Sequence, residues 1–270
     1  WIKGARPRTL PAAIAPVVVG TACVSVEANA TATWSNAILA LIVSLALQVA
    51  VNYANDYSDG VRGTDEKRVG PLRLVGSGAK TASAVKRAAF LSFGVAAIFG
   101  LILALLTSLW LLVVGVLCIL AGWFYTGGKK PYGYFGLGEV FVFVFFGVVA
   151  TTGTTFVIIE KLTATSFTAS LVVGALACAL LAVNNLRDID GDTLARKRTL
   201  AVRLGDKKAR SFFVSLFVLA LLAIFVLALS YPLALLGLVG LGSAFTSIKR
   251  VRSGAVGSEL ISVLSMTGRT

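Results

Sequence analysis

Long runs of apolar residues, separated by short polar segments, dominate the pattern of this chain. The runs cover residues 9–28, 36–57, 82–106, 108–128, 137–158, 167–187, 211–230 and 232–248. Wound as α-helices, most of these runs are long enough to cross about 30 Å of hydrocarbon. The pattern therefore predicts an all-α protein, a polytopic transmembrane helix bundle in which residues 1–270 form a single domain.

Polar residues gather at two corresponding places in this pattern. The first acidic cluster (residues 55–65) follows the second apolar run, and the second acidic cluster (residues 184–192) follows the sixth. With their flanking residues, the two clusters hold eight of the 12 carboxylates. A cluster after the second run of each group of four indicates two pseudo-duplicated four-helix units. Such units would bring the clusters face to face across a central cavity.

The composition agrees with a membrane protein and excludes other classes. Hydrophobic residues make up 57% of the chain and charged residues 14%, which lies outside the range of an ordinary soluble domain. A net charge of +13 could indicate nucleic-acid binding. The basic residues, however, occupy short connections between apolar runs, where no soluble binding domain exists to carry them. We therefore expect the lipid bilayer as a partner and no nucleic acid.

The basic residues also orient the chain. All but two of the 25 Lys and Arg residues lie in the N-terminal arm and in every second connection, Lys161 and Arg269 being the exceptions. Because cytoplasmic connections carry the positive excess, both acidic clusters should face the cytoplasm. We predict a multi-pass protein of the bacterial cell (plasma) membrane, with the acidic loops 52–80 and 184–205 forming a cytoplasmic active-site cap.

The available ligand types narrow the chemistry of the acidic clusters. The chain has no His, and its three Cys lie in apolar runs, so a disulfide framework, a zinc site and a haem site are excluded. A calcium loop also fails, because Thr193 and Thr199 stand where a glycine and a bidentate Glu are needed. Oxygen ligands from Asp and Asn suit Mg²⁺, which carboxylates usually share with substrate phosphates.

Helical spacing places these oxygens on shared faces. Asn55 and Asp59 are four residues apart, and so are Asp188 and Asp192. Basic residues stand beside both clusters, namely Arg62, Lys67, Arg68, Arg73, Arg187, Arg196, Lys197 and Arg198. A metal ion and guanidinium groups together neutralise a diphosphate, whose apolar tail a bilayer would supply. The alternative is that the Asp and Asn residues only terminate helices and that the cations only set the topology.

At these residues the sequence resembles the UbiA superfamily of intramembrane aromatic prenyltransferases, whose marks are two Asp-rich motifs after helices two and six. The match extends to residues 6–11 (RPRTLP), 55–60 (NDYSDG), 70–73 (GPLR), 125–128 (YTGG), 136–139 (GLGE), 184–188 (NNLRD) and 197–205 (KRTLAVRLG). These segments look like the 1,4-dihydroxy-2-naphthoate polyprenyltransferases of menaquinone biosynthesis. Two positions depart from many relatives: the last acid of the first motif is Asp65 where they place it at the position of Gly63, and Arg196 stands where Gly is usual.

The resemblance implies a fold, a reaction and a set of site residues. Family members have nine helices, so the ninth is expected to be missing after the eighth run and its polar stub. Mg²⁺ and a polyprenyl diphosphate would be bound, and the polyprenyl group would pass to 1,4-dihydroxy-2-naphthoate with loss of carbon dioxide and diphosphate, giving demethylmenaquinone. The implied metal ligands are Asn55, Asp56, Asp59, Asp188 and Asp192, the diphosphate ligands Arg62, Arg73 and Lys197, and the substrate contacts Asn52, Tyr125, Asn184 and Asn185.

The acid or base that manages the ring hydroxyl stays open at this stage, with Asp65, Asp190 and Glu139 as catalytic candidates. Glu139 opens an apolar run, where an ionisable side chain is costly and functional by default. A Glu at a helix N-terminus is, however, also favoured by the helix dipole. Tyr125, Tyr132 and Tyr134 either line an aromatic pocket or, for at least two of them, belong to an interfacial belt.

Two other functions compete with this interpretation. The acceptor could be another aromatic compound, such as 4-hydroxybenzoate, homogentisate or a chlorophyllide. Outside enzymes, the acidic residues could form the permeation site of a magnesium transporter. A transport site would place its carboxylates near the bilayer midplane. Here the carboxylates gather at one face of the predicted bundle, which favours the enzyme.

Overall fold

The computed structural model describes the chain except for residues 28–29, 64–71 and 269–270, so Asp65 lies outside the described residues. The described part is helical throughout and contains no strand. In chain order its elements are α1 (Ile2–Ala5), η1 (Pro7–Thr9), α2 (Pro11–Val24), α3 (Ser35–Val61), α4 (Ala82–Leu106), α5 (Leu111–Phe124), η2 (Tyr132–Phe135), α6 (Gly138–Val142), η3 (Phe143–Val149), α7 (Ala150–Ile159), α8 (Ala164–Arg187), α9 (Ile189–Leu194), α10 (Leu200–Ala228), η4 (Pro232–Leu236), α11 (Gly237–Arg252) and α12 (Glu259–Thr267).

The predicted membrane bundle is confirmed, although its count of eight full spans is not. Among the described residues, six helices are long and apolar enough to cross a membrane. A seventh span forms if residues 2–9 and 11–24, bent by 48°, count as one. α5 has only 14 residues. At about 21 Å it falls short of the ~30 Å hydrocarbon layer. The prediction overestimated this run because Gly128, with φ 76°, already belongs to a turn.

The fifth apolar run forms one continuous helix whose middle is a π-helical segment. Residues 143–149 (η3) form a π-helix between α6 and α7. There Gly147 packs directly on α8, since a Cβ at Gly147 would lie 2.5 Å from Gly174 Cα. The π turn presents the consecutive side chains of Phe145 and Phe146 to the same cavity. Single π turns inside α-helices are frequent at functional sites.

Beyond the eighth run the chain folds back as a helix, and the expected polar stub is wrong. α12 buries Leu260 and Val263 in a core cluster that also contains Val183 of α8 and Phe213 of α10. Polar and apolar residues alternate there at helical spacing. Because the helix is only nine residues long, its apolar face shows clearly only when α8 supplies a surface for it to cover.

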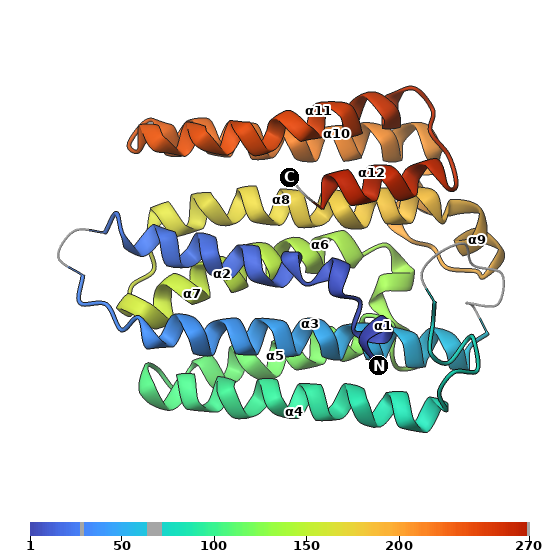
Figure 1. Ribbon diagram of the computed structural model, residues 1–270, viewed down its shortest axis with the longest axis horizontal. Coiled ribbons are helices and arrows are strands. Elements are labelled where there is room, and N and C mark those ends of the chain that lie inside the picture. Colours follow the sequence, from blue (N-terminus) through green and yellow to red (C-terminus); the bar gives the residue numbers. More distant parts are fainter. Residues whose placement is uncertain (28–29, 64–71, 269–270) are drawn as a thin grey trace.

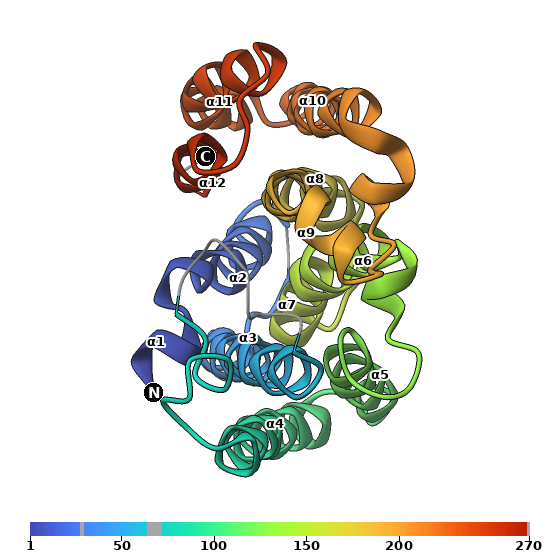
Figure 2. The same ribbon diagram turned by 90° about the vertical axis from the view of Figure 1, so that its right-hand side faces the viewer.

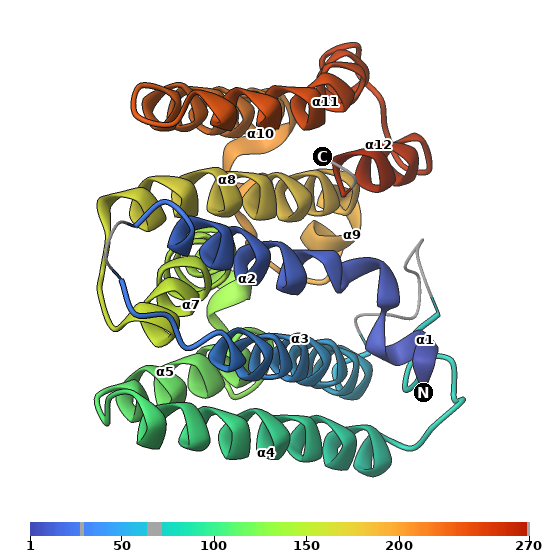
Figure 3. The ribbon, with the colours of Figure 1, turned by 60° about the vertical axis from the view of Figure 1, so that its left-hand side comes forward.

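The long helices run side by side, and the connections rich in Lys and Arg gather at one end of the bundle (Figure 1). α9, α1 and the end of α3 lie at this end, which we call the acidic end. Seen from it, α2, α3, α5, α6 and α8 surround a common centre (Figure 2). α10 and α11 form an outer layer over α8, and α4 forms the outermost layer on the opposite side (Figure 3). The functional residues therefore sit inside the inner ring.

Candidate active site

One cavity of about 2130 Å³ passes through the inner ring and brings the two acidic clusters together. At the acidic end it is lined by Asn55 and Asp59 from α3 and by Asp188, Asp190 and Asp192 from the segment after α8. Away from this end the lining is apolar and includes Val17, Val43, Leu103, Leu111 and Val157. The cavity thus joins a polar, charged mouth to an apolar interior.

Asp59 is the point where both halves of the chain meet. Its Oδ1 accepts a hydrogen bond from the Tyr134 hydroxyl at 2.6 Å and lies 3.1 Å from Lys197 Nζ. Its Oδ2 lies 3.5 Å from Arg73 Nη2. Lys197 Nζ also stands 4.7 Å from the centre of the Tyr134 ring, a cation–π distance. A residue that follows the second acidic cluster therefore pairs directly with the first.

Asp56 does not join this cavity, although the resemblance implied a metal ligand. The residue is fully buried. Its two carboxylate oxygens accept the backbone N–H groups of Leu74 at 2.8 Å and Val75 at 3.0 Å. Asn55 and Asp56 are consecutive residues, so their side chains point about 100° apart around the helix. Asp56 consequently holds the segment after Arg73 against α3 instead of facing the acidic cluster.

Asn55 and Arg62 connect α3 to the connection that follows α5. The Asn55 amide oxygen accepts a hydrogen bond from the Thr126 hydroxyl at 2.7 Å. The Arg62 guanidinium donates to the backbone carbonyls of Thr126 and Gly128. Both side chains line the cavity. Thr126 was not singled out by the sequence, although it lies inside the YTGG segment. Arg62 therefore fixes the rim of the cavity as well as adding positive charge to it.

The second acidic cluster is organised by Arg187. Its guanidinium binds both oxygens of Asp188, at 2.6 and 2.7 Å, and the amide oxygen of Asn184 at 2.9 Å. α8 ends at this point, and Asp188 is its C-cap. The following turn closes when Lys197 N–H donates to the Asp192 carbonyl at 2.8 Å. Arg196 there has φ 56°, the left-handed conformation that the more usual Gly would adopt, so the loop keeps its backbone despite the substitution.

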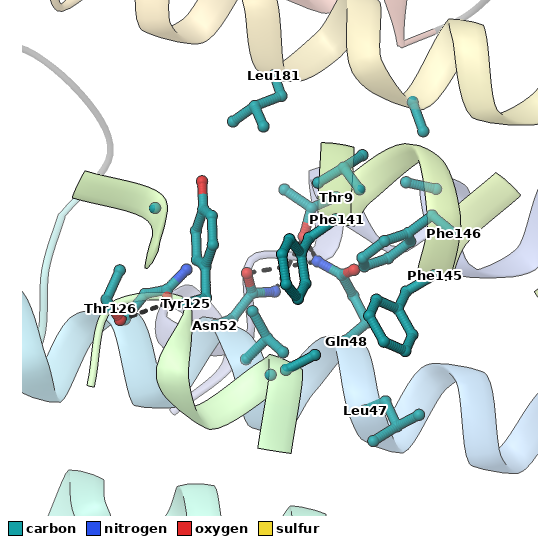
Figure 4. Close-up of a pocket in the computed structure, with 18 of the residues that line it drawn as sticks. Thr9, Leu47, Gln48, Asn52, Tyr125, Thr126, Phe141, Phe145, Phe146 and Leu181 are labelled. Carbon is teal, nitrogen blue, oxygen red and sulfur yellow. Dashed lines mark hydrogen bonds between the residues drawn. The ribbon is translucent and has the colours of Figure 1, made fainter. Parts of the chain in front are cut away.

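A polar network ties the N-terminal arm to α3 and includes Asn52. The Asn52 amide donates to the Ala5 carbonyl at 2.8 Å and to the Thr9 hydroxyl at 3.0 Å, and Gln48 also donates to Thr9 at 3.0 Å. Figure 4 shows Asn52, Gln48 and Thr9 together on one wall of the cavity, with Tyr125 beside them. Sequence reasoning missed Gln48, whose signal was a polar side chain one turn before Asn52 inside an apolar run.

Aromatic side chains line the next part of the cavity. All three tyrosines, Tyr125, Tyr132 and Tyr134, belong to the lining, which contradicts an interfacial belt for two of them. The Tyr132 ring stacks on Phe141 at 3.9 Å between centres and meets the Tyr125 ring edge-on at 5.6 Å. Burial raises the pKa of the Tyr132 phenol. It therefore stays protonated at neutral pH and keeps donating to the Ala121 carbonyl at 2.8 Å.

Glu139 lies behind the cavity wall and contacts it through Asn185. Glu139 is buried, and its Oε1 accepts a hydrogen bond from Asn185 Nδ2 at 2.9 Å. Its Oε2 has no hydrogen-bond partner among the described residues. Asn185 itself lines the cavity, whereas Glu139 does not. Of the three candidate acids, only Asp190 is a described residue that faces the cavity directly.

The donor set at the acidic end fits Mg²⁺ in chemistry. It consists of carboxylate and amide oxygens, the hard ligands that this ion prefers. No group of three or more His, Cys, Asp or Glu residues stands close enough to hold a metal on its own within the described part of the chain. Oxygen ligands of this kind suit an ion that one or two carboxylates share with the phosphates of a substrate.

Comparisons with known proteins agree with this geometry. Residues 13–258 match the model of the UbiA prenyltransferase family. The 1,4-dihydroxy-2-naphthoate octaprenyltransferase of Mycobacterium tuberculosis is 51% identical over 99% of this chain and 91% of that protein. The enzyme of the same description from Escherichia coli is 38% identical over 80% of this chain and 72% of that protein.

Solved structures share the fold at low sequence identity. A UbiA homologue from Archaeoglobus fulgidus, bound to GPP and Mg²⁺, superposes with a TM-score of 0.72 at 13% identity, covering 98% of this chain and 94% of that one. The apo structure of a UbiA homologue from Aeropyrum pernix gives a TM-score of 0.71 at 15% identity, covering 96% of this chain and 93% of that one.

Proposed function

Since the chain belongs to the UbiA prenyltransferase family, we propose that it transfers a polyprenyl group from a polyprenyl diphosphate to 1,4-dihydroxy-2-naphthoate in menaquinone biosynthesis. The reaction releases diphosphate and carbon dioxide and gives demethylmenaquinol, the hydroquinone form of demethylmenaquinone. The observation that carries this proposal is one continuous cavity, in which acidic and basic side chains form one end and apolar walls the other. Such a cavity matches a donor with a charged head and a long hydrocarbon tail.

The donor head belongs at the acidic end. Asn55, Asp59, Asp188 and Asp192 are our candidates for holding Mg²⁺, and the metal, when bound, would stabilise the charge that develops on the departing diphosphate. The UbiA homologue of known structure that binds GPP and Mg²⁺ supports this pairing of metal and donor. We leave Asp56 out of the ligand set, because both of its carboxylate oxygens are occupied by backbone N–H groups.

Cationic side chains complete the donor site. Arg73 and Lys197 stand on either side of Asp59, where each can donate to a phosphate oxygen of a diphosphate. Charge-assisted hydrogen bonds of this kind are about twice as strong as neutral ones. Arg62, already bound to two carbonyls, adds charge at the rim. We propose that these three residues hold the diphosphate while its bond to the allylic carbon breaks.

The aromatic section of the cavity is suited to the allylic cation that forms when diphosphate leaves. Tyr125, Tyr132 and Phe141 present ring faces and edges to the space just beyond the acidic end. Aromatic faces attract cations electrostatically, and they also exclude water that would otherwise capture the cation. The electron-rich naphthoate ring then attacks through carbon, so no covalent intermediate with the protein is needed.

On the acceptor side, we assign Glu139 a positioning role that acts through Asn185. The Glu139 carboxylate accepts a hydrogen bond from Asn185 Nδ2, which fixes the direction of the amide in a residue that lines the cavity. We propose that the Asn185 amide oxygen accepts a hydrogen bond from a naphthoate hydroxyl, with Asp190 as the acid that lines the cavity itself. Asp65, the third candidate, stays a proposal.

Replacing Glu139 tests this role. In Glu139→Gln the amide oxygen can still accept from Asn185, so we expect near-normal kinetics. In Glu139→Leu the Asn185 amide loses its orientation. We then expect the KM for naphthoate to rise about tenfold, which corresponds to the loss of one hydrogen bond to the acceptor. The KM for the donor should not change. Steady-state kinetics with each substrate varied in turn measure both values. Equal losses in the two variants would instead make the Glu139 carboxyl a direct acid or base.

Product analysis tests the proposed function as a whole. Purified protein in detergent, supplied with Mg²⁺, octaprenyl diphosphate and 1,4-dihydroxy-2-naphthoate, should release carbon dioxide and form a prenylated naphthoquinol. Replacing naphthoate by 4-hydroxybenzoate or homogentisate should abolish product. Product with one of these acceptors and none with naphthoate would overturn the acceptor assignment. Mg²⁺ flux into liposomes without any prenyl transfer would instead support a transporter.

We also propose that the acidic end faces the cytoplasm at the plasma membrane, because it carries nearly all Lys and Arg residues. A membrane-impermeant maleimide should label Lys130→Cys in inside-out vesicles and not in intact cells. Labelling of intact cells would reverse this orientation.

A further inference from the structure

Away from the acidic end, α4 and α5 both contribute residues to the lining of the cavity. Near the acidic end they pack tightly, since a Cβ on Gly122 of α5 would lie 3.1 Å from the Phe93 ring of α4 and 2.9 Å from Val51 of α3. Gly122 is therefore a packing glycine that admits Phe93. The Phe93–Gly122 contact gives a reference level for the antiparallel pair.

Two further glycines, one on each helix, lie at the same depth in the bundle, farther from the acidic end than the Phe93–Gly122 contact. Gly100 follows Phe93 by two helical turns, and Gly115 precedes Gly122 by two turns, so each lies about 10 Å farther from the acidic end on the same face of its helix. Both line the cavity. A Cβ added to either would meet nothing within 4 Å. The cavity therefore has open space beside both glycines, and we call this space the glycine gap.

The lining around the glycine gap is apolar and small. It includes Ala96, Ala97 and Leu101 of α4 and Leu112 and Cys118 of α5. No charged side chain belongs to either helix at this level. The gap is continuous with the cavity that holds the acidic clusters. An apolar chain fits such a space, whereas an aromatic acid or a phosphate does not.

We propose that the glycine gap holds the distal isoprene units of the donor and thereby sets the length of prenyl tail that the enzyme accepts. This proposal rests on the proposed function and adds a specificity determinant to it. Gly115 lies ten residues before Tyr125, about 15 Å along the helix axis. A geranyl tail, about 10 Å long when extended at ordinary carbon–carbon bond lengths, ends before the gap. Longer tails reach it.

Glycine at these positions is required for space, and a larger side chain would fill the gap. In Gly100→Leu or Gly115→Leu the new side chain projects into the volume that the distal tail occupies. Overlap between this Leu side chain and the prenyl tail should lower kcat/KM for a long donor at least as much as one misplaced methylene group does, which is about tenfold or more. A geranyl donor avoids the overlap. The same substitutions therefore separate long donors from short ones.

The chain offers a matched control in Gly94. It lies on α4, and a Cβ there also meets nothing within 4 Å, but Gly94 does not line the cavity. Gly94→Leu therefore adds the same side chain to the same helix without entering the cavity. We expect its donor preference to equal that of the unmodified protein.

The experiment compares octaprenyl and geranyl diphosphate by two readouts. The first is kcat/KM with naphthoate. The second needs no acceptor and measures how far each donor, with Mg²⁺, raises the melting temperature of the detergent-solubilised protein. We expect Gly100→Leu and Gly115→Leu to lower the octaprenyl-to-geranyl ratio of kcat/KM at least about tenfold. The melting shift from octaprenyl diphosphate should shrink while that from geranyl diphosphate persists.

The proposal would be overturned by an unchanged ratio and unchanged octaprenyl shift in both variants, or by an equal loss for both donors. A ratio that falls equally in Gly94→Leu would also overturn it. If the unmodified protein binds both donors but forms no product with naphthoate, the proposed acceptor fails, and the melting shifts alone then decide whether the glycine gap holds the tail.

Discussion

Asp59→Asn is expected to lower prenyl transfer by about two to three orders of magnitude, the usual cost of removing a charged group that acts on the transition state. The protein should still fold and enter the membrane. Asn has the same shape, and its amide oxygen can still accept hydrogen bonds from Tyr134 and Lys197, which now meet at Asp59 Oδ1. What disappears is the negative charge at the point where both halves of the chain converge.

This prediction is checked by kcat/KM at saturating Mg²⁺, together with the melting temperature of the same preparation. Asp206→Asn is the matched control, because Asp206 pairs with Arg210 at 2.7 Å on α10 and is mostly exposed. It does not line the cavity, so its activity should be unchanged. Activity of Asp59→Asn within a few-fold of the unmodified protein would remove Asp59 from the proposed ligand set.

Asp56→Ala, three residues away, is expected to act mainly on stability. Its two oxygens accept the backbone N–H groups of Leu74 and Val75 in a site with no access to solvent. Removing the carboxylate leaves two buried donors without a partner, at about 2–5 kcal/mol in total. For a chain of this size that corresponds to a fall in melting temperature of about 5–15 °C.

The contrast between the two aspartates is the decisive observation. Asp56→Asn retains one acceptor oxygen and should fall between Asp56→Ala and the unmodified protein in stability. At temperatures where it remains folded, its apparent affinity for Mg²⁺ should be unchanged, because Asp56 does not reach the cavity. A large loss of Mg²⁺ affinity without loss of stability would make Asp56 a metal ligand after all.

Much of the fold and part of the site were predictable from the sequence. The apolar runs located α3, α4 and α8 to within a few residues, because these helices are continuous and have clear polar boundaries. The spacing of Asn55 and Asp59 correctly placed both on one helix face, and the duplicated clusters predicted their meeting in one cavity. These inferences need only helix geometry and the order of elements.

The remaining features depend on contacts between distant segments. Nothing in local spacing shows that Lys197 pairs with Asp59 or that the turn around Leu74 supplies two N–H groups to Asp56. The roles of Tyr134 and Glu139 likewise follow from partners on other helices. Motif membership marked Asp56 and Asp59 alike, and only the packed structure separates a side chain that faces the cavity from one that holds a loop.

The position of Lys197 and Arg73 around Asp59 makes binding an exchange of partners. A carboxylate that already balances two cations has little attraction left for a third, so Mg²⁺ alone should bind weakly here. A diphosphate draws both cations to itself and frees the carboxylate for the metal. Metal and donor then strengthen each other's binding by the same factor, as thermodynamic linkage demands. Mg²⁺ should therefore bind tightly at Asp59 only when a diphosphate donor is also bound.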